Sequence, residues 1–169
     1  MTHEEQEFIL KLSTSEISQE DFLKKFGASR QEVPLLIERL LRESFKEADE
    51  DGIDCALLVG FVFGFGVRHI QILCELSDAD GHHSHEDIVS ALDELRTPRA
   101  TDVFFRAIQA RHKYLDFDDA HALAVKALYA LSNLNTESAR EKIRLATHSD
   151  VPRIAEQARE RLRELKTDS

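Results

Sequence analysis

Tryptophan is absent from this sequence of 169 residues, and proline, glycine and cysteine are scarce. Three prolines and six glycines leave few positions at which a helix is forced to end. The two cysteines, Cys55 and Cys74, lie in apolar surroundings without Cys-x-x-Cys spacing, which predicts buried thiols in a reducing cytoplasm. The composition therefore favours long helices and gives no sign of a disulfide framework.

Long hydrophobic segments are also missing. The longest apolar run, residues 56–67, is too short to span a bilayer. The first residues, MTHEEQEF, have neither the basic start nor the apolar core of a signal peptide. These features predict a soluble cytoplasmic protein that has no membrane partner.

Basic residues are in the minority, with 22 Lys and Arg against 32 Asp and Glu, a net charge of −10. Such a field repels phosphate backbones and anionic lipid and attracts basic partners. No basic stripe of the kind that nucleic-acid binders carry is visible. The charge therefore predicts a basic protein partner and no nucleic acid.

The pattern of apolar residues is helical almost throughout. Residues 53–64 are apolar on all sides, which predicts a buried central helix or, as a less favoured alternative, a strand. Further helices are predicted near residues 67–77, 85–96, 99–112, 118–133, 136–148 and 151–165. We therefore predict an all-α protein of about nine or ten helices. It would form one domain over 1–169, with N-terminal helices in 1–50, a repeat core in 51–150 and a capping helix in 151–169.

An internal repeat explains this regularity. Residues 91–109 align with residues 130–148 at an offset of 39, close to the roughly 40 residues of a two-helix solenoid unit. Residues 53–77 are a candidate for a third, degenerate copy. The aligned pairs are Ala91 with Ala130, Leu92 with Leu131, Leu95 with Leu134, Thr97 with Thr136, Ala100 with Ala139, Phe104 with Ile143 and Ala107 with Ala146.

These two copies resemble HEAT-type units, which implies a right-handed α-solenoid of helical hairpins. The segments HEDIVSALDELRTPRATDVFFRAI and YLDFDDAHALAVKALYALSNLNTESAREKIRLA are similar to a family of small bacterial HEAT-like proteins. The similarity covers roughly residues 18–165 and is densest over 85–146. Such proteins resemble immunity proteins, which neutralise a toxin domain delivered between competing bacteria. The resemblance thus implies a binding role for the chain.

The loop DADGHHSHED, residues 78–87, raises the question of a metal. It is not a calcium loop, because His83 and Val89 occupy the positions where Gly and Glu are required. The histidines could bind zinc or nickel, or the loop could be a solvated linker in which Ser84 caps the next helix. We favour the linker and predict no metal, no cofactor and no enzymatic activity. The alternative is a metal-dependent or cofactor-handling HEAT-like enzyme that uses this loop.

The connectors between predicted hairpins are rich in acidic residues. In a two-helix solenoid the connectors alternate between two edges, and this register places the acidic ones on one edge and RTPR and NLNT on the other. We predict that the acidic edge binds the partner. The candidate residues are Asp49, Glu50 and Asp51 in the first connector, Asp78, Asp80, Glu86 and Asp87 in the second, and Tyr114, Asp116, Phe117, Asp118 and Asp119 in the third.

The third connector, YLDFDD, allows two interpretations. Asp118 or Asp119 can cap the following helix while Tyr114 and Phe117 anchor the loop, which would be a structural role. An aromatic ring beside acids is also a typical anchor for a basic partner. The sequence predicts a protein that binds and neutralises a basic toxin domain, such as a nuclease, and it leaves both roles of this connector open.

Overall fold

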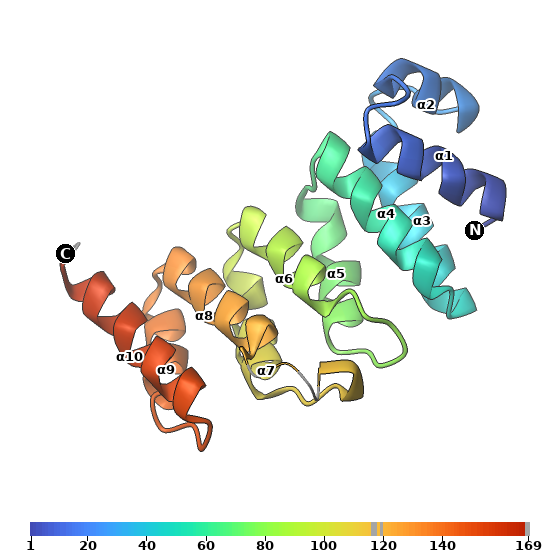
Figure 1. Cartoon of the computed structure of the whole chain (residues 1–169). Helices are drawn as coiled ribbons and strands as arrows, with labels where there is room; N and C mark the ends of the chain where they lie inside the picture. Colours follow the sequence, from blue (N-terminus) through green and yellow to red (C-terminus); the bar gives the residue numbers. More distant parts are fainter. Residues whose placement is uncertain (116–117, 119, 168–169) are drawn as a thin grey trace. The chain divides into compact units, whose positions relative to one another are not determined.

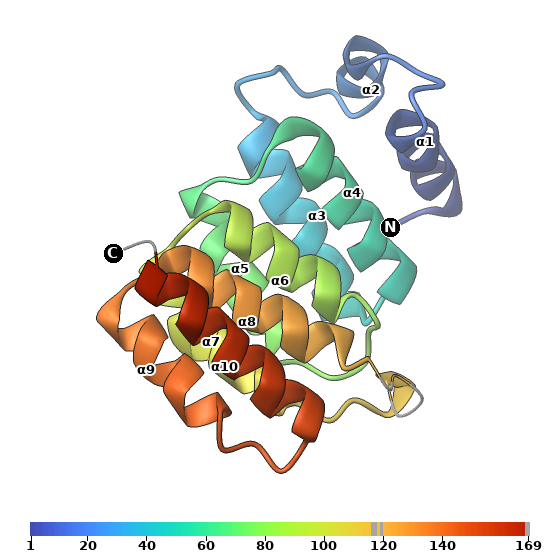
Figure 2. The ribbon, with the colours of Figure 1, turned by 60° about the vertical axis from the view of Figure 1, so that its left-hand side comes forward.

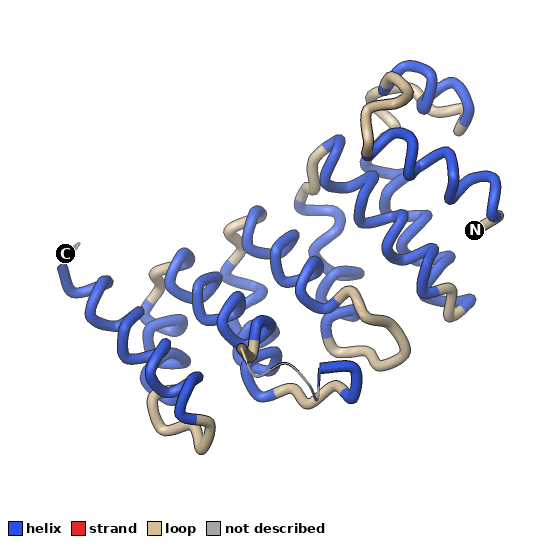
Figure 3. The backbone as a smooth tube through the Cα atoms, viewed as in Figure 1, coloured by secondary structure: helices blue, strands red, loops and turns tan. Residues whose placement is uncertain are grey.

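The computed structural model describes residues 1–115, 118 and 120–167. Within these residues the chain forms ten α-helices and three short 3-10 helices, and no strand (Figures 1 and 3). The prediction of an all-α protein with nine or ten helices is confirmed, and residues 53–64 belong to a helix. The chain divides into two compact units, residues 1–76 with 81–84 and residues 77–80 with 85–169. That residues 1–169 form a single domain stays a prediction.

Unit 1 contains six helical segments. They are α1 (His3–Ser13), α2 (Gln19–Lys25), α3 (Val33–Glu47), α4 (Glu50–Phe63), η1 (Val67–His69) and most of α5 (Ile70–Ser77). The central helix α4 packs against α3 and α1, which explains why it is apolar on several sides. Its buried residues Ile53, Ala56 and Val59 are at most 2% exposed.

A buried histidine fastens α3 to η1 in this unit. His69 Nε2 lies 2.8 Å from the carbonyl oxygen of Pro34, and the N–H of Gly66 donates to His69 Nδ1 over 2.9 Å. A carbonyl oxygen only accepts, so Nε2 must carry the proton while Nδ1 keeps its lone pair. This pair of contacts therefore fits the neutral ring protonated at Nε2.

Unit 2 contains the other seven segments. They are α6 (His85–Glu94), η2 (Pro98–Ala100), α7 (Thr101–Gln109), η3 (Lys113–Leu115), α8 (Ala122–Leu134), α9 (Glu137–Ala146) and α10 (Pro152–Thr167). Helix α8 is central and contacts α6, α7, α9 and α10. Helices α6, α8 and α10 lie side by side, and α7 contacts α9 in the layer behind them (Figure 2).

The 39-residue repeat is visible in the burial of unit 2. Each aligned apolar pair falls in the same burial class, from Ala91 and Ala130 at 0% exposure to Ala107 and Ala146 at 6% and 5%. The turns are similar as well, because both threonine hydroxyls accept a backbone N–H. Thr97 accepts from Arg99, two residues on, and Thr136 accepts from Ala139, three residues on. The sequence repeat thus corresponds to a structural repeat of helix, turn and helix.

The residue before each of these threonines has a left-handed backbone. Arg96 has φ 46° and Asn135 has φ 51°, and they too are related by the offset of 39. Asn tolerates this conformation better than Arg does, because its short side chain can hydrogen-bond locally. The same turn is therefore more strained in the first copy than in the second.

The cysteines differ from each other. Cys55 is buried, and desolvation, together with the nearby charge of Asp54, raises the pKa of its thiol to about 11. Cys74 is only partly buried, so the prediction of two buried thiols is wrong for this residue. Across the described part of the chain, no helix combines the length and apolar character needed to cross a membrane.

Candidate functional site at the connectors

The first acidic connector belongs to unit 1, where it mostly serves the fold. Asp49 accepts hydrogen bonds from the Met1 ammonium at 2.9 Å and from Gly52 N at 3.0 Å, and so caps α4. Burial alone would raise the pKa of Asp49, but these two bonds together hold the pKa below its ordinary value. Glu50 lies 2.7 Å from His83 Nδ1, whereas Asp51 is exposed. Of the three predicted residues in this connector, Asp49 and Glu50 have partners in the fold, and Asp51 is the one that is exposed to solvent.

The histidine-rich loop is not the solvated linker that the sequence favoured. His82 is 2% exposed, its Nε2 lies 2.9 Å from the carbonyl oxygen of Leu76, and its Nδ1 accepts from Ser84 N. The Ser84 hydroxyl in turn donates to the carboxylate of Asp54. The imidazole replaces water as the partner of backbone groups, and the loop folds over it.

In unit 2, His85 braces the second connector against the third. This ring is 1% exposed, and its Nε2 lies 2.9 Å from the carbonyl oxygen of Ala79. Its Nδ1 lies 2.9 Å from the Tyr114 hydroxyl, and its ring stacks on His112 with the centroids 3.7 Å apart. Tyr114 is half-buried in this cluster. Tyr114 was predicted to anchor its loop against its neighbours, and the structure places it there.

The acids of the second connector divide into paired and displayed groups. Asp78 accepts two hydrogen bonds from the Arg106 guanidinium, at 2.8 and 2.7 Å, and Glu86 lies 3.1 Å from Lys126 Nζ. Asp80 is 98% exposed and its carboxylate lies 3.5 Å from His112 Nδ1. Asp87 is exposed in the first turn of α6. The displayed carboxylates of this unit's second connector are thus Asp80 and Asp87.

The third connector is longer and less acidic than predicted. Helix α7 ends at Gln109, not near residue 112, so the connector covers residues 110–121 and includes Arg111, His112 and Lys113. The prediction that this helix extends to about residue 112 is therefore wrong, and the connector carries basic residues beside its acidic ones. The error arose because Arg111 and His112 continue the helical pattern without a Gly or Pro to end it.

The structural interpretation of YLDFDD predicted that Asp118 or Asp119 caps the following helix, and Asp118 does so. Its two oxygens accept hydrogen bonds from Ala120 N at 3.1 Å and from Ala122 N, the first residue of α8, at 2.6 Å. The other predicted residues of this segment, Asp116, Phe117 and Asp119, lie outside the described residues. The prediction that all three acidic connectors share one edge stays a prediction.

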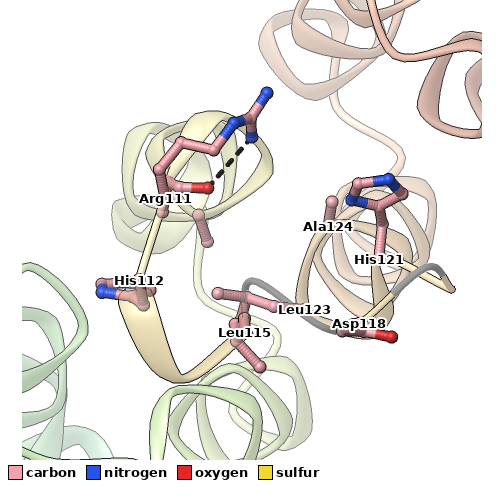
Figure 4. A pocket seen from close by; sticks show the side chains of 9 residues that line it. Arg111, His112, Leu115, Asp118, His121, Leu123 and Ala124 are labelled. Carbon is pink, nitrogen blue, oxygen red and sulfur yellow. Dashed lines mark hydrogen bonds between the residues drawn. The ribbon is translucent and has the colours of Figure 1, made fainter.

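A pocket of about 180 Å³ opens between this connector and the starts and ends of its flanking helices (Figure 4). Its floor is apolar and includes Ala107, Leu123 and Ala124, each at most 6% exposed. The polar side chains that line it are Arg111, His112, Asp118 and His121. This site was not predicted from the sequence, although the basic run Arg-His-Lys directly before YLDFDD was a signal for it.

Metal-binding geometry was the other hypothesis for the histidine-rich loop. Within the described residues, no three His, Cys, Asp or Glu side chains gather closely enough to hold an ion. Both nitrogens of His82 and of His85 lie within hydrogen-bonding distance of protein atoms. The alternative hypothesis of a metal-dependent enzyme therefore gains no supporting observation from this loop.

Comparisons of the chain with protein-family models, with curated proteins and with solved structures find no match.

Proposed function

We propose that this protein is a non-catalytic binding module, a HEAT-like right-handed α-solenoid that neutralises a cognate bacterial toxin domain in the cytoplasm. The partner is a basic domain, such as a nuclease, and the contact is made through exposed carboxylates at the connectors. Two features of unit 2 support the solenoid. Its 39-residue repeat is matched in burial and in turn chemistry, and α6, α8 and α10 form one layer.

The observation that carries the binding proposal is the set of carboxylates that remain displayed on ordered elements. Asp51 and Asp87 are exposed in the first turns of α4 and α6, and Asp80 is almost fully exposed. The first turn of a helix holds a carboxylate at low cost, because the helix dipole favours a negative charge there. In a chain of net charge −10, carboxylates displayed in either unit attract a basic partner.

The paired carboxylates are excluded from this surface. Asp49, Asp78, Glu86 and Asp118 each bond to a cation or to backbone N–H groups in the same unit. Changing them would disturb the fold before it disturbed binding. Glu50 is also excluded, because it lies 2.7 Å from His83 Nδ1. Among the described residues the acidic surface is therefore Asp51, Asp87 and Asp80, which stays 98% exposed although it lies 3.5 Å from His112 Nδ1.

The first step of the test is to identify the adjacent gene. If it encodes a toxin domain, the association rate of that domain with the wild-type chain is measured by stopped flow. The triple variant Asp51→Asn, Asp80→Asn, Asp87→Asn should associate about tenfold more slowly at low salt, because exposed charges act chiefly on the association rate. A control with the same change of charge at exposed sites elsewhere is Glu20→Gln, Glu43→Gln, Glu156→Gln. Equal rates for the two triple variants would reject the displayed carboxylates as the contact, and failure of the wild-type chain to inhibit would reject the immunity role.

A further inference from the structure

Two arginines at the end of α7 differ in their partners. Arg106 is held by both oxygens of Asp78. Five residues later, Arg111 is exposed, and its guanidinium donates to the carbonyl oxygen of the preceding residue, Ala110, over 3.1 Å. Within the described residues no carboxylate lies within ion-pair distance of Arg111. In a chain with ten more acidic than basic side chains, a guanidinium that has no carboxylate partner among the described residues is a candidate to receive one from outside.

Arg111 lines two pockets of unit 2. The first is the pocket of Figure 4, with Leu115, Leu123 and Ala124 among its apolar residues. The second has a volume of about 330 Å³ and an apolar part made by Phe105, Ile108 and Leu145. Leu145 is 49% exposed, so this second pocket presents apolar surface to solvent. Arg111 thus lines two neighbouring pockets, and each of them can receive an apolar side chain.

The charges of the first pocket favour an anion next to Arg111. The carboxylate of Asp118 also lines the first pocket, but both of its oxygens accept backbone N–H groups at the start of α8. The positive end of that helix dipole offsets its charge. His121 lines the same pocket and adds a ring nitrogen that can donate. In the second pocket, Asp150 carries a negative charge and His148 and Gln109 supply polar groups.

From this arrangement we infer that the Arg111 surface binds a peptide segment in which one acidic residue is flanked by apolar residues. The acidic side chain forms a bidentate pair with Arg111, which planar guanidinium and carboxylate groups favour. The neighbouring apolar side chains enter the two pockets and contact the apolar residues that line them. A pocket of the first one's size suits a single side chain, because sites for larger ligands occupy about 300–1,000 Å³. This inference is independent of the proposed toxin and of the displayed carboxylates.

The test is an NMR titration of the full chain with the blocked peptide acetyl-Leu-Glu-Leu-amide. The methyl signals of Leu115, Leu123 and Leu145 report on the two pockets. We expect saturable shifts at all three, with affinity reduced about tenfold or more for the matching peptide in which Gln replaces Glu. The variant Arg111→Gln should show the same loss for the Glu peptide. This change is safe for folding, because Arg111 is exposed and its hydrogen bond within the described residues is to its neighbour's carbonyl.

The matched control is Arg99→Gln, which removes an exposed arginine at the other end of the hairpin and should bind the Glu peptide as the wild type does. Equal affinity for the Glu and Gln peptides, or an unchanged affinity in Arg111→Gln, would overturn the inference. So would the absence of saturable shifts up to the solubility limit of the peptide. None of these outcomes depends on the toxin assay, so the two proposals fail separately.

Discussion

Two connectors of this protein are held in place by different chemistry. The histidine-rich loop, residues 78–87, is fastened by buried imidazoles that bond to backbone carbonyls, as His82 and His85 do. The connector of residues 110–121 is fastened near α8 by the carboxylate of Asp118, which accepts backbone N–H groups. A neutral ring can be buried completely, whereas a carboxylate keeps part of its surface in water. Removing a buried ring should therefore cost more than removing the capping carboxylate.

The largest effect is expected for His85→Ala. The substitution deletes a ring that is 1% exposed and leaves the carbonyl oxygen of Ala79 and the hydroxyl of Tyr114 without this partner. We expect a loss of about 3 kcal/mol in the free energy of unfolding, measured by urea denaturation. Tyr114→Phe is the control, since it removes only the hydroxyl and should cost about 1 kcal/mol. A loss below that of Tyr114→Phe would mean that the ring does not hold the loop.

The second largest loss of stability is expected at Asp49, whose carboxylate caps α4 and also pairs with the Met1 ammonium. Asp49→Ala removes the bond to Gly52 N and the pairing with the Met1 ammonium, and should cost about 1.5 kcal/mol near neutral pH. The pKa of Asp49 in the folded state lies below its unfolded value. Its ionic contribution is therefore present above about pH 4 and is lost as the pH falls through the folded pKa. The stability gap between wild type and Asp49→Asn should narrow over that fall, and a gap that widened would contradict this assignment.

Asp118→Ala should have a smaller effect than either of these. It removes the acceptor for Ala122 N at the start of α8, for which about 1 kcal/mol is expected. Asp118→Asn should recover part of this loss, because the amide oxygen can still accept. Thermal unfolding followed by circular dichroism separates the three proteins. An equal loss of unfolding free energy in Asp118→Ala and His85→Ala would contradict the idea that a buried imidazole holds its connector more strongly than a capping carboxylate does.

The smallest expected change is an increase in stability, and it concerns the turn within a hairpin instead of a connector between hairpins. Arg96→Gly relieves the left-handed backbone at φ 46° and should raise the free energy of unfolding by about 0.5–1 kcal/mol. The equivalent Asn135→Gly should give a smaller gain, since Asn already tolerates this conformation. Chemical denaturation of the two single variants measures the difference. A larger gain at Asn135 would contradict the idea that the two turns differ through their residue type.

The helices and their buried faces could be predicted because they follow from local rules. The spacing of apolar residues predicted the helices α4, α7 and α9. The 39-residue repeat predicted equivalent buried positions, such as Phe104 and Ile143, which are both 0% exposed. Thr97 and Thr136 could be recognised because a hydroxyl before a helix accepts a backbone N–H. Each of these signals involves residues close in the chain.

The candidate site was harder to predict, because the contacts of its side chains are with residues that are distant in sequence. Histidine is found both inside and at the surface, and nothing in the loop of residues 78–87 shows that His82 and His85 are buried while His83 is 62% exposed. The acidic residues give no local sign of which will pair. Asp78 pairs with Arg106, 28 residues away, whereas Asp87 stays exposed. The pocket beside Arg111 depends on where α7 ends, and helix ends without Gly or Pro carry a weak signal.

The buried imidazoles have a consequence for the response of this protein to zinc. Zinc coordinates the lone pair of a deprotonated ring nitrogen. In the folded chain the ring nitrogens of His69, His82 and His85 lie against protein donors and acceptors, so an ion gains access to them only when the chain opens. By mass action, a ligand that prefers the unfolded chain lowers the melting temperature, and the effect grows with ligand concentration. A histidine-rich segment usually suggests metal-stabilised structure, whereas in this protein added zinc should act as a denaturant.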